Sequence, residues 1–131
     1  MHRLIRRPPR PLKRFGYWWS PEEPELPHPR DYVDASWGAG ERQSVVAYLT
    51  NAYYLYPWMG FSWCRLGCPD STYMGAWDMT DGTWLFPEGL VHYVAHHGVK
   101  PREEFLEDVR RAGFRMPELP ASEPLPGTAS S

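Results

Sequence analysis

Two cysteines and two histidines in this chain have the spacing of metal ligands. Cys64 and Cys68 are the only cysteines, and they lie four positions apart. His92 and His96 follow, also four positions apart, which places two imidazoles on one face of a helix. Structural zinc sites take four thiolate and imidazole ligands in a tetrahedron. The pattern therefore predicts a structural zinc site formed by Cys64, Cys68, His92 and His96.

Several alternatives to this ligand set stay open. His97 competes with His96 for the fourth position, although a residue five positions after His92 points further from the shared face. The cysteines could instead be small buried hydrophobic residues or form a disulfide. The histidines could simply form a surface near the negative end of a helix dipole. The spacer between the two pairs is also about twice that of a common zinc finger.

A catalytic role has weaker support. A His-Glu-x-x-His metalloprotease needs a glutamate where this chain has Tyr93. Glu88 lies one turn before the first histidine and could act as a base, but at a helix start it is better explained as a dipole partner. A nucleophilic pair of Cys64 or Cys68 with His97 stays open because a sequence does not give their distance. We therefore predict no catalytic residue and favour a protein without enzymatic activity.

Local signals predict the elements that would position these ligands. Asp81-Gly82 favours a hairpin turn, because glycine adopts the positive φ that such turns need. Pro87 fits the first turn of a helix, and Gly98 fits its C-cap. We expect helices at 40–51 and 87–97 and a third from 101 that Gly113 closes. Between the first two helices we expect short strands within 53–63, ending at the cysteines, and the hairpin strands 73–79 and 83–86. The predicted fold is α+β: a small antiparallel sheet with a hairpin, packed against three helices, with a zinc-finger-like Cys/His site and disordered tails.

Aromatic residues make up 15% of the chain and can dominate a small core. Trp63, Trp77 and Trp84 fall on predicted strands, so we expect them to be buried. Trp58 lies between a proline and a glycine and is expected to be the most exposed. The aromatic cluster at 15–19 should fold back onto the body, since exposed neighbouring aromatics are costly.

Composition divides the chain into three parts. Residues 15–115 are predicted to form one domain between a basic disordered arm at 1–14 and a disordered Pro/Ser-rich tail at 116–131. The arm holds six of the 14 lysines and arginines and no acid, so the other residues carry eight basic and 16 acidic side chains. Such an arm suits a tether to an anionic partner or to its own acidic body, or it is simply a solvated leader. Nucleic-acid binding is therefore expected only through residues 1–14.

The chain contains no apolar stretch long enough to span a membrane and no recognisable secretory signal. Two cysteines are too few for a secreted disulfide framework, so the cytoplasm is the expected compartment. The favoured function is a small zinc-stabilised protein-interaction or adaptor module, with contact regions in the tails and at 53–58 and with another protein as partner. A small metal- or thiol-dependent enzyme and nucleic-acid binding through the arm are the alternatives.

Three stretches of the sequence also resemble an uncharacterised bacterial protein family. They are LPHPRDYVDASW (26–37), FSWCRLGC (61–68) and MTDGTWLFPEGLVHYVAHHGVKPREEF (79–105). That family has no established activity. The resemblance therefore implies a bacterial origin and a shared fold, and it transfers no catalytic residue.

Overall fold

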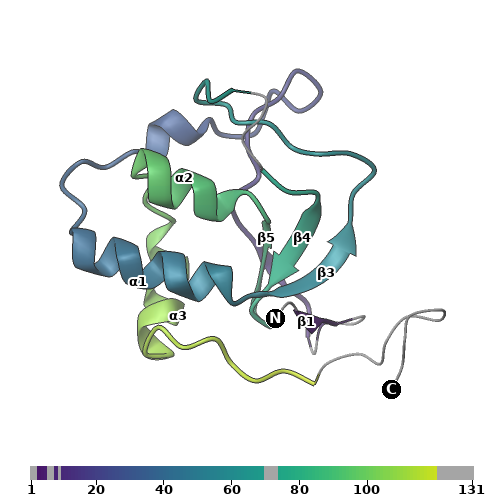
Figure 1. Cartoon of the computed structure of the whole chain (residues 1–131), viewed down its shortest axis with the longest axis vertical. Coiled ribbons are helices and arrows are strands. Elements are labelled where there is room, and N and C mark those ends of the chain that lie inside the picture. The colour runs from purple at the N-terminus through teal and green to yellow at the C-terminus, as the bar shows by residue number, and fades with distance from the viewer. Residues whose placement is uncertain (1–2, 6–7, 9, 70–73, 121–131) are drawn as a thin grey trace.

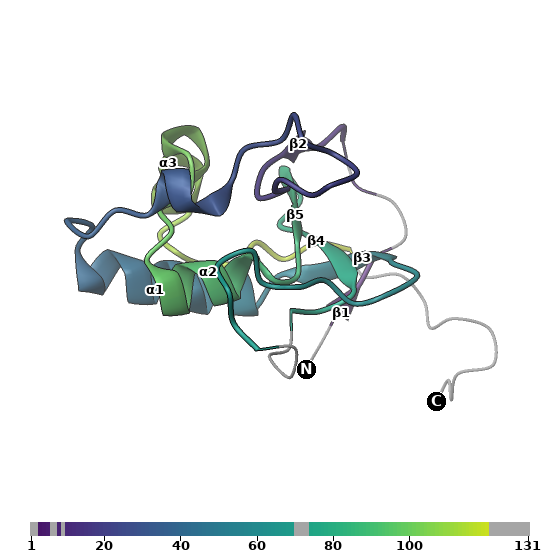
Figure 2. The ribbon, with the colours of Figure 1, turned by 90° about the horizontal axis from the view of Figure 1, so that it is seen from above.

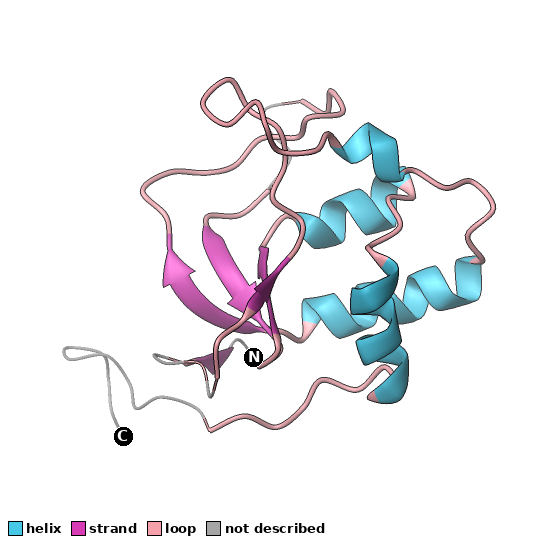
Figure 3. Cartoon of the chain, turned by 180° about the vertical axis from the view of Figure 1, so that it is seen from behind, coloured by secondary structure: helices cyan, strands magenta, loops and turns pink. Residues whose placement is uncertain are grey.

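A five-stranded sheet stands beside three helices, which gather on one side of it (Figures 1 and 3). The computed structural model describes residues 3–5, 8, 10–69 and 74–120. The helices are α1 (Ala39–Thr50), α2 (Leu90–His97) and α3 (Glu103–Arg111), preceded by a 3-10 turn, η1 (Pro29–Tyr32). The strands are β1 (Arg3–Leu4), β2 (Lys13–Arg14), β3 (Tyr53–Pro57), β4 (Trp77–Thr80) and β5 (Trp84–Pro87), in spatial order β1-β3-β4-β5-β2. The protein thus has the predicted α+β fold.

The predicted hairpin joins β4 and β5, which pair antiparallel. Gly82 has a φ of +93°, which side chains larger than hydrogen rarely allow. Asp81 is buried in the turn, where its Oδ1 accepts hydrogen bonds from the backbone N–H groups of Thr83 and Trp84. Its Oδ2 accepts a third, 2.6 Å long, from the Tyr48 hydroxyl of α1. Asp81 is therefore a turn former, as predicted, and it also ties the hairpin to a helix.

The sheet is mixed because the N-terminal segment adds a strand at each edge. Residues 1–14, expected to be a disordered basic arm, instead include β1, parallel to β3, and β2, parallel to β5, among their described residues. Figure 2 shows β2 beside β5. Burial of Ile5, which is 1% exposed against Tyr53 and Leu55, explains the pairing. Lys13 forms an ion pair with Glu104, so the segment is tethered to its own acidic body.

The end of the described chain also packs on the sheet. The tail at 116–131 was expected to be disordered, but its described residues contact Tyr53. The Tyr53 hydroxyl donates to the Pro117 carbonyl over 3.0 Å and accepts from the Leu119 N–H over 2.8 Å. Residues 121–131 lie outside the described residues.

The segment between β3 and β4 contains no strand in its described residues, in contrast to the strand expected before the cysteines. The N–H groups of Trp58 and Ser62 donate to the carbonyls of Ala76 and Gly75, 2.7 and 2.9 Å away. A proline and a glycine at 57 and 60 interrupt the ladder that a strand would need. The first hairpin strand was expected from 73, but β4 begins at Trp77, and 70–73 are outside the described residues.

Two residues were predicted to mark the ends of α2, and the structure confirms only one of them. Gly98 adopts a left-handed conformation with a φ of +65°, and its N–H donates to the Tyr93 carbonyl, so the predicted C-cap is confirmed. Pro87 was expected in the first helical turn. It instead ends β5 opposite Asp78, and α2 begins at Leu90. No helix in the described part of the chain is long and apolar enough to cross a membrane.

The core centres on Phe105 of α3, which is fully buried. Four other aromatic rings have centroids 5.5–6.4 Å from that of Phe105: those of Phe15, Tyr48, Trp84 and Phe86. These rings come from the N-terminal segment, α1, β5 and α3. Phe15 and Trp18 are each only 5% exposed, so the aromatic cluster at 15–19 does fold back onto the body.

The three tryptophans that were expected in the core differ in burial. Trp84 is 1% exposed, and Trp77 is partly buried against the core. Trp63 is 47% exposed, so its predicted burial is wrong. Its ring lies instead under the guanidinium of Arg65, 4.3 Å from the ring centroid, because no strand carries it into the core.

An ion pair joins the start of α1 to the end of α3. Glu41 accepts two hydrogen bonds of 2.9 Å from the Arg110 guanidinium and one of 2.8 Å from the Trp37 indole. The hydrogen bonds from Arg110 have the largest effect on the pKa of Glu41, followed by the one from Trp37, and together they lower it from 4.5 to about 2. The ionised carboxylate therefore stabilises the fold above the pKa of the unfolded side chain.

We expect Glu41→Gln to lower the free energy of unfolding by about 1 kcal/mol at neutral pH, because the pair is partly exposed. The difference from wild type should shrink as the pH falls from about 5 toward the folded pKa of about 2, since the wild-type carboxylate then takes up its proton. Urea unfolding across that range measures it. Glu107→Gln, at an exposed acid without an ion pair among the described residues, is the control. If the destabilisation by Glu41→Gln does not vary with pH over this range, the lowered pKa of Glu41 is contradicted.

Candidate metal centre

Helix α2 presents two imidazoles beside two thiols. His92 lies in its first turn, and His97 is its last residue, directly before the Gly98 C-cap. Cys64 and Cys68 flank a turn in which Gly67 has a φ of +90° and donates its N–H to the Cys64 carbonyl. The left-handed glycine lets the chain reverse sharply enough to bring both thiols to one side.

Tyr93 docks the cysteine turn onto the helix. Its hydroxyl accepts the backbone N–H of Arg65 over 2.8 Å and contacts the Trp63 carbonyl at 3.4 Å. The Arg65 side chain adds a hydrogen bond of 3.0 Å to the Trp19 carbonyl. The turn is thus held from its backbone between α2 and the N-terminal segment.

One ligand atom from each of Cys64, Cys68, His92 and His97 lies within 4.8 Å of all the others. The His97 Nε2 is 3.5 Å from the Cys64 Sγ and 3.3 Å from the Cys68 Sγ. A tetrahedral zinc ion with bonds of about 2.3 Å to sulfur and 2.0–2.1 Å to nitrogen would place such atoms about 3.6 Å apart. Both thiols are free, so no disulfide competes for them. The group is close enough to hold a metal ion.

His92 supplies a second, independent indication. Its Nε2 is buried and has no hydrogen-bond partner among the described residues. Burial lowers the pKa of His92, and the charges of His96 and His97 lower it further. Burial, and then His96, lower the pKa of His97 too. Both rings are therefore held neutral, which is the protonation state that leaves a nitrogen lone pair for a metal.

His97 takes the position that the sequence assigned to His96. The ring of His96 stacks beside that of His92, with centroids 4.8 Å apart, but it is exposed and outside the thiol cluster. The cysteine turn is docked on Tyr93, and His97 lies one helical turn after Tyr93 on the same face. His96 lies one helical turn after His92 and outside the cluster. The structure thus groups His97, the alternative to His96 in the predicted ligand set, with Cys64, Cys68 and His92.

The acidic residues that the sequence singled out lie elsewhere. Glu88 Oε1 accepts the backbone N–H of Ala76, and its Oε2 accepts the Tyr54 hydroxyl. Asp78 lies on β4 and accepts a hydrogen bond from the Tyr17 hydroxyl. Neither acid belongs to the Cys/His cluster. The docking role of Tyr93 was not predicted from the sequence. Tyr93 lies four positions before the candidate ligand His97, a spacing that places both side chains on one helix face and could have indicated the role.

Comparisons with protein-family models, with curated proteins and with solved structures found no match to this chain. The resemblance of 26–37, 61–68 and 79–105 to an uncharacterised bacterial family stays a prediction.

We expect Tyr93→Phe to weaken metal binding by about ten- to a hundredfold, because outer residues that orient ligands have effects of that size. The variant leaves the Arg65 N–H without an acceptor, which should also cost about 1–2 kcal/mol of stability. Competition with a chelator of known affinity measures the first effect and urea unfolding the second. Tyr56→Phe, at an exposed tyrosine, is the control. Equal metal affinity in the two variants would contradict a positioning role for Tyr93.

Proposed function

We propose that this protein is a small protein-interaction or adaptor module whose loop 58–76 is stabilised by zinc bound to Cys64, Cys68, His92 and His97. The observation that carries the proposal is the buried Nε2 of His92, which has no hydrogen-bond partner in the described part of the chain and lies beside two free thiols and a second imidazole. A buried polar atom without a partner is costly, and a metal ion would satisfy it.

The donor set favours zinc among the common metals. Two thiolates and two imidazoles are typical of structural zinc sites, whereas calcium and magnesium prefer oxygen ligands. Four protein ligands leave no open position for water or substrate, which favours a structural over a catalytic role. Zinc in such a site can contribute about 10 kcal/mol or more to folding, comparable to the stability of a whole small domain.

An interaction role is supported by apolar side chains next to the metal centre. Four large hydrophobic residues before Cys64 are exposed: Tyr56 at 44%, Met59 at 106%, Phe61 at 76% and Trp63 at 47%. Exposed apolar groups clustered in one segment mark contact sites for other proteins. Another protein is therefore the partner that we propose, with a metal-braced loop as its contact region.

Two alternatives have narrower support. The distances from the His97 Nε2 to the two thiols also suit a Cys–His nucleophilic pair, so a thiol-dependent enzyme is the second candidate. Nucleic-acid binding through residues 1–14 has less support, because Arg3 and Lys13 already pair with Glu118 and Glu104. A bacterial cytoplasm, where thiols stay reduced, is the compartment that suits two free cysteines.

Metal content of the purified protein, measured by elemental analysis, tests the proposal. We expect about one zinc per chain. A Cys64→Ser, Cys68→Ser double variant should lose the zinc and should no longer unfold cooperatively on heating. His97→Ala should lose the metal as well, whereas His96→Ala, its neighbour outside the cluster, should keep it.

A metal-free, stably folded wild type would refute the zinc site and favour the thiol enzyme. The same loss of zinc from His96→Ala and His97→Ala would contradict the proposed ligand set. Chelation provides a second measurement, since removal of a structural zinc should lower the melting temperature of the wild type and of His96→Ala, which keeps the metal.

A further inference from the structure

The sulfur atoms of Cys64 and Cys68 lie within reach of each other. They belong to a group of ligand atoms that all lie within 4.8 Å of one another. The Gly67 N–H donates to the Cys64 carbonyl over 3.3 Å, so the chain turns back directly before Cys68. An S–S bond is about 2.05 Å long, and a change of rotamer moves a cysteine sulfur by about 3 Å. Rotation of one side chain can therefore bring the two sulfurs into bonding distance.

The two thiols differ in burial and in freedom to move. Cys64 is 7% exposed, and its Sγ accepts the backbone N–H of Leu66 over 3.4 Å. Cys68 is half-buried between two exposed residues, Gly67 and Pro69. A methyl group on Gly67 would meet no atom within 4 Å, so space is open beside the turn. Cys68 is therefore the thiol that a reagent in solution meets first and the one that can swing toward the other.

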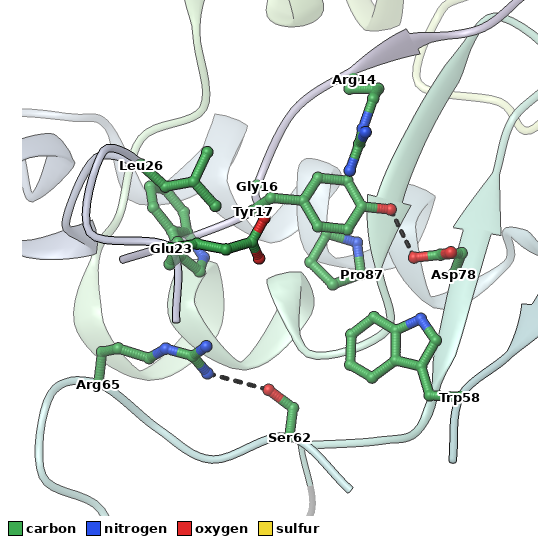
Figure 4. Close-up of a pocket in the computed structure, with 11 residues that line it drawn as sticks. Arg14, Gly16, Tyr17, Glu23, Leu26, Trp58, Ser62, Arg65, Asp78 and Pro87 are labelled. Carbon is green, nitrogen blue, oxygen red and sulfur yellow. Dashed lines mark hydrogen bonds between the residues drawn. The ribbon is translucent and has the colours of Figure 1, made fainter. Parts of the chain in front are cut away.

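Arg65 anchors the Cys64 end of the turn. Figure 4 shows its guanidinium bonded to the Ser62 hydroxyl, 3.1 Å away, in the wall of a pocket of about 340 Å³. Its Nε donates to the Trp19 carbonyl over 3.0 Å. Trp58, expected to be the most exposed tryptophan, is instead half-buried in the same wall. These hydrogen bonds hold the residue directly after Cys64, so closure of the thiol pair would move Cys68.

A zinc ion and a disulfide would use the same two sulfur atoms. Zinc binds cysteine as the thiolate, and a disulfide contains no thiolate. Oxidation would leave only the imidazoles of His92 and His97 from the cluster, which is two ligands fewer than a structural zinc site needs. Metal binding and disulfide formation therefore exclude each other.

We propose that Cys64 and Cys68 form a redox-sensitive pair, which a small disulfide compound oxidises with release of the zinc that links the turn to α2. The thiol chemistry stands on the geometry of the two cysteines, whereas the release of zinc rests on the proposed function. The oxidised protein loses the metal link between its contact loop and the helix.

The oxidation takes two thiol–disulfide exchanges. The Cys68 sulfur attacks the small disulfide, forms a mixed disulfide and expels one small thiolate. The Cys64 sulfur then attacks the Cys68 sulfur, closes the internal disulfide and expels the second thiolate. Each departing thiolate takes up the proton that its attacking cysteine has lost. The protein thus gives up two hydrogen atoms, and the small disulfide is reduced to two thiols.

Equilibration of the full-length protein, as purified, with glutathione buffers of rising glutathione disulfide content tests the proposal. Mass spectrometry after an acid quench reports the thiols, and a chromogenic chelator reports free zinc. We expect a form two hydrogens lighter without attached glutathione, and one zinc released for each such molecule. Cys64→Ser is the control, and it should stop at the glutathione adduct of Cys68.

Three outcomes would overturn the redox pair: no oxidation, a wild type that stops at glutathione adducts, or a lighter form that keeps its zinc. A wild type purified without zinc would refute the proposed function and the zinc release. The mass measurement would then decide the thiol chemistry by itself, so the two failures are distinguishable.

Removal of zinc before the titration tests the competition between metal and disulfide. It should lower the glutathione disulfide content at half-oxidation by at least about tenfold, because zinc stabilises only the reduced protein. Equal midpoints with and without zinc, in a protein that carries the metal, would overturn the competition.

Limited alkylation of the native wild-type protein tests which thiol reacts first. Trypsin cleaves after Arg65, so the two cysteines fall on different peptides. With iodoacetamide below one equivalent, we expect at least about threefold more label on Cys68 than on Cys64, because Cys68 is the more exposed thiol. Complete labelling after denaturation calibrates the two peptides. Equal labelling, or a preference for Cys64, would overturn the assigned order.

Discussion

The aromatic contacts around Phe105 are the interaction on which the rest of this structure depends. The chain is short, and each buried aromatic ring removes about 150–250 Å² from water, so a few rings supply much of the available stabilisation. Phe15, Trp84 and Phe86 bring the N-terminal segment and β5 against α3. The candidate metal centre lies outside these ring contacts, between α2 and the cysteine turn.

The described residues of the loop between β3 and β4 make both apolar and polar contacts. Cys64 and Met74 are buried in the core, and the Tyr93 hydroxyl of α2 accepts the backbone N–H of Arg65. A metal ion at the thiols would add a further link between this loop and α2, because the two clustered histidines lie on that helix.

Arg65 links the cysteine turn to two other parts of the molecule through different atoms. Its backbone N–H anchors the turn on Tyr93 of α2, while its guanidinium donates to the Trp19 carbonyl. The N-terminal segment therefore takes part in positioning the turn that presents the thiols.

The sequence by itself determined what depends on neighbouring residues: the hairpin at Asp81-Gly82, the end of α2 at Gly98, and the residue types of the metal ligands. Turn and cap geometry follow from local φ preferences and side-chain hydrogen bonds. Only the tertiary structure decided which contacts close over long separations in the chain. It brought His97, rather than His96, close to the thiols because the cysteine turn docks on Tyr93. It also added β1 and β2 to the sheet, because the sheet edges offered unpaired backbone groups and a place to bury Ile5.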